Sequence, residues 1–103
     1  MLEEGKLRET PLHLAARVKD GDRCALMLLK SGAGPNLTDN GQTPVHVAAK
    51  NGNLTTLLLL LEDGGDPLFQ NKIGETPLHL ASRSCKADVV KHLIDSVKSR
   101  QGV

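Results

Sequence analysis

The sequence predicts an all-α solenoid in which three helix-turn-helix repeats are joined by hairpin-like loops. The main observation is an internal repeat, because TPLHLAA at residues 10–16 recurs as TPVHVAA at 43–49 and as TPLHLAS at 76–82. The three copies are evenly spaced along the chain. A single domain is therefore expected over residues 1–103, with repeats at approximately 1–36, 37–69 and 70–103.

Each copy of the motif begins with a threonine and a proline, which together form a helix start. A threonine hydroxyl can accept hydrogen bonds from the free N–H groups of the first turn. Proline suits the first helical position because the N–H group that it lacks would be unpaired there. We expect a short helix to begin at each of the pairs Thr10 and Pro11, Thr43 and Pro44, and Thr76 and Pro77.

A second apolar stretch follows each motif, at residues 24–29, 54–61 and 89–94. These stretches predict the second helix of each repeat. GAGPN at 32–36 and GGDPL at 64–68 then place glycine at a helix end and proline in the chain that follows. The third stretch continues through VKSRQ without such a turn, so the last helix is expected to be longer.

This arrangement resembles the ankyrin repeat family, whose TPLHLAAxxG pattern, apolar second helix and GADxN turn can be traced across nearly the whole chain. The phrases RVKDGDRCALMLLKSGA and LEDGGDP resemble the ankyrin array of a mechanosensory TRP channel of the no-mechanoreceptor-potential-C (TRPN) type. That resemblance implies a non-catalytic cytoplasmic segment of a channel's elastic spring, which also binds cytoskeletal or adaptor proteins or neighbouring repeats. The alternative is a free-standing ankyrin adaptor that binds one protein through its concave face.

The chain departs from the family pattern at three places. RVKDGD between the first two helices is one residue longer than the pattern, and the connector LTDNGQT is one residue shorter. Cys85 stands where Gly52 stands in the middle repeat, which implies about 1 kcal/mol of backbone strain or a reshaped turn. Neither end has a polar cap, so self-association is expected through Leu2 and Leu7 at one end and Val97 at the other.

The composition argues against several classes of function. A net charge of +1 and the absence of Trp and Tyr do not favour nucleic acid binding. The longest apolar run, Leu57 to Leu61, is far shorter than the roughly 20 residues of a membrane-spanning helix, so no direct membrane insertion is expected. Cys24 and Cys85 have no metal-like spacing and favour a reducing, cytoplasmic setting. Cys24 is expected to be buried and Leu58 exposed.

We expect no catalytic site, metal or cofactor. His13, His46 and His79 recur with the motif and so occupy equivalent places in successive repeats. The resemblance implies that each histidine is hydrogen-bonded to its capping threonine and to neighbouring backbone. His92, expected on the exposed side of the last helix, has no metal-binding partner four residues later.

Two columns of side chains are the candidate partner-binding site, since they also recur at the spacing of the motif. The resemblance places both columns on the concave side of the stack. They bind a partner or neutralise each other across the groove, and the sequence leaves both alternatives open. The basic column is Arg17, Lys50 and Arg83, and the column before the first helices is Glu9, Gln42 and Glu75.

Overall fold

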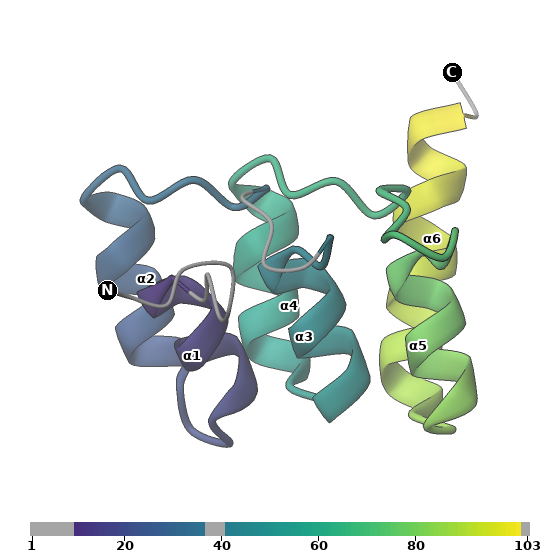
Figure 1. The fold of residues 1–103 in the computed structure, drawn as a ribbon, viewed down its shortest axis with the longest axis horizontal. Helices are drawn as coiled ribbons and strands as arrows, with labels where there is room; N and C mark the ends of the chain where they lie inside the picture. The colour runs from purple at the N-terminus through teal and green to yellow at the C-terminus, as the bar shows by residue number, and fades with distance from the viewer. Residues whose placement is uncertain (1–9, 37–40, 102–103) are drawn as a thin grey trace.

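The computed structural model describes residues 10–36 and 41–101, and it contains six helices in this part of the chain. Three helix pairs stand side by side along the 45 Å long axis, and loops connect one pair to the next (Figure 1). The described residues form no β-strand, so the expected all-α stack is confirmed. The helices are α1 (Pro11–Arg17), α2 (Asp22–Lys30), α3 (Pro44–Asn51), α4 (Leu54–Glu62), α5 (Pro77–Arg83) and α6 (Ala87–Gln101).

The first helix of each pair begins as the sequence predicts. Thr10, Thr43 and Thr76 are N-caps with extended backbone, and each side chain accepts a hydrogen bond from the backbone N–H three residues later. Proline occupies the first helical position in all three. The capping hydrogen bonds of all three helix starts thus form between residues of the TPxH motif itself.

The second helices α2, α4 and α6 lie where the sequence predicts them, and a glycine follows the end of α2 and of α4. Gly32 and Gly64 follow α2 and α4 with a φ of 98° each, a left-handed conformation that glycine adopts without steric cost. No such glycine interrupts the last helix before Gln101, and α6 reaches 15 residues, so the longer terminal helix is confirmed.

Small side chains on the first helices form one side of the core. Ala16, Ala48, Ala49 and Ala81 are fully buried, and α1, α3 and α5 pack in a row against one another. Aliphatic side chains from the second helices cover this row, and the residues in contact include Leu57, Leu60, Val89 and Leu93. Because alanine lets helix backbones approach closely, the stack needs no buried aromatic ring.

Asparagine side chains link successive repeats through the backbone. The Nδ2 group of Asn53 donates to the carbonyl oxygens of Ala16 and Val18, at 2.5 and 3.0 Å. Asn36 accepts from the N–H of Asp66 at 2.8 Å and donates to the Gly64 carbonyl at 3.1 Å. These amides pair backbone groups that the helix ends leave free.

The longer turn between α1 and α2 depends on a glycine. Gly21 is buried, and a Cβ atom at this position would lie 2.0 Å from the carbonyl oxygen of Ala15. A side chain cannot fit at that distance. Glycine at position 21 lets the chain pass directly over the end of α1, and this path accommodates the extra residue of the RVKDGD segment.

Two expectations about burial are wrong and one is confirmed. Cys24, expected to be buried, is exposed, because its stripe of α2 faces the end of the described stack. His92, expected on the exposed side of α6, is half-buried and lines a hollow between α4 and α6. Leu58 is 40% exposed, as expected. Leu2, Leu7 and Glu9 lie outside the described residues.

Cys85 has a φ of 55° and is the one non-glycine residue in the described ranges with a positive φ. Cys85→Gly should therefore raise the free energy of unfolding by about 1 kcal/mol, which chemical denaturation can measure. The matched control is the neighbouring Ser84→Gly, where φ is −88° and glycine should destabilise the fold. Equal effects of the two substitutions would contradict the strain at Cys85.

Candidate functional site

Histidine side chains can act in acid–base catalysis or bind metal ions, but the structure gives the motif histidines a structural role. The Thr10 N–H donates to Nδ1 of His13 at 3.3 Å, and the Thr10 hydroxyl lies 2.9 Å from the same nitrogen. Nε2 of His13 lies 2.8 Å from the carbonyl oxygen of Gln42 in the next repeat. The imidazole therefore closes its own helix start and reaches across to the following repeat.

His46 repeats this geometry in the middle of the stack. Its Nδ1 lies 3.2 Å from the Thr43 nitrogen, and its Nε2 lies 2.9 Å from the Glu75 carbonyl oxygen. Because the Thr43 N–H is a donor, Nδ1 must accept, and the proton of the neutral ring is on Nε2. Both ring nitrogens are thus occupied, which leaves neither for a metal ion or for proton transfer to a substrate.

Burial lowers the pKa of His46 from its usual 6.5 to about 4. The nearby Phe69 backbone and the negative charge of Asp66 act in the opposite direction, but the loss of hydration outweighs them. The Phe69 ring meets the imidazole edge-on, with ring centroids 6.3 Å apart. His46 is therefore neutral at physiological pH, as its hydrogen bonds require.

His79 completes only half of the pattern. Its Nδ1 accepts from the Thr76 N–H at 3.0 Å, as in the other repeats. Its Nε2 has no hydrogen-bond partner among residues 10–36 and 41–101, and the side chain is exposed. The difference follows from the position of α5, which has no further helix pair beside it in the described stack.

The described residues contain no cluster of three or more His, Cys, Asp and Glu side chains that could hold a metal ion. No helix in the described ranges is both long enough and apolar enough to cross a membrane.

The structure brings together four of the six residues in the two predicted columns. Lys50 lies in the last turn of α3, Arg83 lies in the last turn of α5, and Gln42 and Glu75 precede the capping threonines. They surround a hollow of about 200 Å³, which we call the Lys50 hollow. Its lining residues are Gln42, Lys50, Asn71, Ile73, Glu75, Leu80, Arg83 and Ser84.

The charges of the Lys50 hollow are only partly paired with each other. Arg83 forms a salt bridge with Glu75, and the Glu75 carboxylate also accepts from the Asn71 amide at 3.3 Å. The Lys50 side chain is exposed and has no ion pair with any residue that the structure describes. Arg83 and Glu75 are therefore neutralised within the columns, whereas Lys50 faces solvent.

Four residues that belong to neither predicted column also line the hollow, namely Asn71, Ile73, Leu80 and Ser84. Asn71 accepts from the N–H groups of Ile73 and Glu75, at 3.0 and 2.9 Å, and thereby shapes the loop before α5. Ile73 is 76% exposed at this loop. The signal for both is the NKIG turn, because asparagine commonly bonds to backbone two residues later. Arg17, at the end of α1, lies outside the hollow.

Comparison with protein families supports the repeat assignment. The family model described as ankyrin repeats (3 copies) matches residues 12–101, which is nearly the whole chain. No curated protein matches the chain.

The lowered pKa of His46 predicts that stability depends on pH. As pH falls from 6.5 towards 4, the unfolded chain binds a proton at His46 that the folded chain does not, so folding stability should fall across this window. Denaturation at pH 7, 6 and 5 measures the effect. A His46→Gln variant should be less stable at pH 7 yet lose less stability on acidification. Identical pH slopes for both proteins would contradict this role.

Proposed function

The chain belongs to the ankyrin repeat family, and we propose that it is a non-catalytic module that binds a partner protein at the Lys50 hollow. The observation that carries this proposal is the exposed side chain of Lys50, which lines the same hollow as the Arg83 and Glu75 salt bridge. The partner is expected to present an acidic side chain to Lys50. Ankyrin repeats are a protein-interaction module, which agrees with this assignment.

The surroundings of Lys50 support a peptide-like ligand. Ile73, whose apolar side chain is exposed, and Gln42, which carries a side-chain amide, both line the hollow with Lys50. The Arg83 and Glu75 pair is exposed on the arginine side, so it contributes little to stability on its own and can exchange partners. An extended acidic segment with one apolar side chain would satisfy all three groups.

The histidine geometry supports the absence of catalysis. His13 and His46 use both ring nitrogens for internal hydrogen bonds, and His79 uses Nδ1 for its own helix start. A general base must be free to reach the proton that it removes. The repeated imidazoles therefore serve the fold.

For the wider setting, we propose a segment of the cytoplasmic elastic spring of a mechanosensitive TRP-type cation channel. The support for this role is the likeness of RVKDGDRCALMLLKSGA and LEDGGDP to TRPN-type arrays, together with a stack in which each repeat contacts its neighbours. A free-standing cytoplasmic adaptor is the second setting. The complete reading frame distinguishes them, because a channel subunit continues into further repeats and membrane spans.

Charge reversal at Lys50 tests the binding surface. Lys50→Glu should weaken binding of a fluorescent acidic peptide about tenfold, which corresponds to about 1.4 kcal/mol, and wild-type binding should weaken as salt is added. Fluorescence anisotropy measures both effects. Lys30→Glu is the matched control, since Lys30 is also exposed in a last helical turn but lies outside the hollow. Equal affinity of Lys50→Glu and Lys30→Glu proteins would overturn the proposed surface.

The spring role predicts that the stack opens in steps. Residues 76–101 should exchange their amide hydrogens at a lower free energy of opening than residues 43–66, because Cys85 is strained and His79 lacks its cross-repeat bond. Hydrogen exchange followed by mass spectrometry measures this difference. Uniform protection over both segments, with a single unfolding event under force, would show a rigid block instead.

A further inference from the structure

The second helices α4 and α6 enclose a groove of about 570 Å³, which we call the α4–α6 groove. Its α4 side runs from Thr55 to Glu62, about two helical turns, and its α6 side runs from His92 to Ser96, about one turn. The Lys50 hollow is instead lined by the first helices and the chain next to them. Because the α4–α6 groove lies between two successive repeats, it does not depend on what precedes or follows the described stack.

Leucines of α4 form the apolar part of the α4–α6 groove. Leu58 is 40% exposed, and Leu59 and Leu61 are half-buried beside it. These three side chains lie within about one helical turn, so they present their apolar surface together. A ligand that places an apolar side chain against Leu58 would remove this surface from water, which favours binding.

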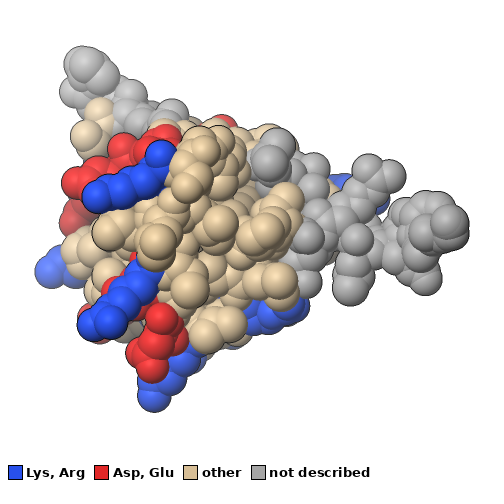
Figure 2. Space-filling view, turned by 90° about the vertical axis from the view of Figure 1, so that its left-hand side faces the viewer, with Lys and Arg blue, Asp and Glu red and all other residues tan. Residues whose placement is uncertain are grey.

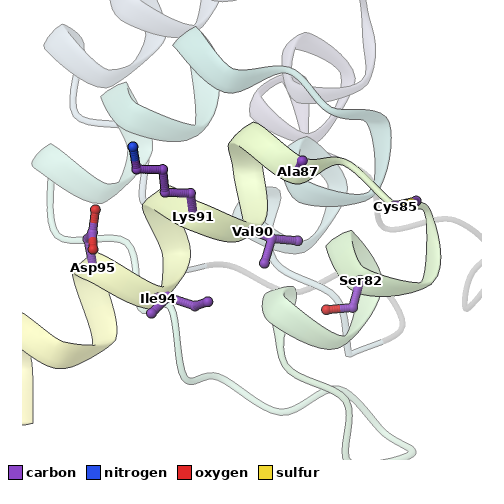
Figure 3. Close-up of a pocket in the computed structure, with 7 residues that line it drawn as sticks. All are labelled: Ser82, Cys85, Ala87, Val90, Lys91, Ile94 and Asp95. Carbon is purple, nitrogen blue, oxygen red and sulfur yellow. The ribbon is translucent and has the colours of Figure 1, made fainter.

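The charged side chains that line the α4–α6 groove, Glu62 and Asp95, are both acidic. Both are exposed, and neither forms an ion pair with a residue of the ranges 10–36 and 41–101. Lys91 lies about one turn before Asp95, and Figure 3 shows that the two side chains project together from α6. Lys91 does not line the groove, however, so the two carboxylates there have no basic neighbour in the lining.

The preceding junction has a different charge pattern at the equivalent positions. Lys30 and Glu62 are the last residues of α2 and α4, which both have nine residues, and Asp95 follows Glu62 at the spacing of the motif. The first junction therefore has opposite charges, whereas the second has two acids. Figure 2 likewise shows Lys and Arg next to Asp and Glu along the left and lower edges of the α1 and α2 end. The α4–α6 groove is thus a local acidic site on a chain whose net charge is +1.

His92 adds a polar group without a partner to the α4–α6 groove. The residue is half-buried, and its ring forms no hydrogen bond with any residue that the structure describes. His13 and His46 differ in this respect, because both of their ring nitrogens are occupied. A half-buried polar group that lacks a partner is unfavourable, and a bound peptide can supply the missing hydrogen bond.

We propose that the α4–α6 groove binds a basic amphipathic helix of a partner protein. An apolar side chain of that helix packs against Leu58, and its lysine or arginine side chains reach Glu62 and Asp95. The length of the α4 side suits a helix laid along it, since amphipathic helices bury their apolar face in grooves of this kind. The carboxylates would repel a nucleic acid or an anionic lipid surface. The proposal concerns a different surface from the Lys50 hollow and does not depend on it.

A leucine and lysine peptide tests this proposal. The probe is a fluorescent peptide of roughly 14 residues, with leucines on one helical face and lysines on the other. Fluorescence anisotropy should show that it binds the unmodified chain, and added salt should weaken the complex. A peptide of the same composition with its leucines spread around the helix should bind more weakly. General attraction of a basic peptide would not explain binding, because the net charge of the chain is +1.

Two pairs of variants locate the site. Leu58→Ala should weaken binding of the probe about fivefold. Its matched control is Leu26→Ala, since Leu26 is also 40% exposed but lies on α2, where it should leave the affinity unchanged. Glu62→Lys should weaken binding about tenfold. Its control is Asp20→Lys, because Asp20 is also exposed and acidic but lies outside the groove. Circular dichroism checks that all four variants fold.

The position of the bound probe gives a second readout. Its addition should change the backbone amide NMR signals of Leu58, His92 and Ser96, whereas the signal of Lys50 should stay unchanged. Failure of the probe to bind, equal effects of a variant and its control, or signal changes outside the α4–α6 groove would each overturn the proposal. Lys50→Glu should bind this probe normally, so failure of either surface leaves the other standing.

Discussion

The hydrogen bond from the imidazole Nε2–H to a carbonyl of the next repeat connects local and long-range structure in this molecule. His13 and His46 each close their own helix start through Nδ1 and reach the following repeat through Nε2. One side chain therefore helps to fix both the start of its own helix and the position of the following repeat. The arrangement requires a neutral ring, which agrees with the resistance of the fully buried His46 to protonation.

The packing of the core is consistent with this constraint. Bridges of 2.8 and 2.9 Å hold the first helices at short separation, and only small side chains fit between them. Ala16, Ala48 and Ala49 occupy these positions and are fully buried. Leucines fill the rest of the core from both helices of a pair, such as Leu12 on α1 and Leu57 and Leu60 on α4, so a chain with one phenylalanine and no tryptophan or tyrosine still forms a continuous core.

The sequence alone predicts the local elements well, because their signals are carried by neighbouring residues. Residues close together in the sequence were enough to predict the helix starts at the three TPxH motifs, the glycines after α2 and α4, and the longer α6. The exposure of Cys24 and the partial burial of His92 depend on what packs against each helix, and hydrophobic periodicity does not contain that information. The columns identified Lys50 and Arg83, whereas Asn71 and Ile73 enter the same hollow through a loop whose shape is set by side-chain to backbone bonds.

The longer turn that passes over the end of α1 at Gly21 affects how such a protein can be rebuilt or can evolve. The added residue lies in the turn before α2 and outside both helices, so the apolar side of α2, with Ala25 and Leu29, still faces the core. The shorter connector after α2 restores the even spacing of the capping threonines. Turn and connector thus form a matched pair, and the segment that can be duplicated or exchanged as a unit runs from one capping threonine to the next.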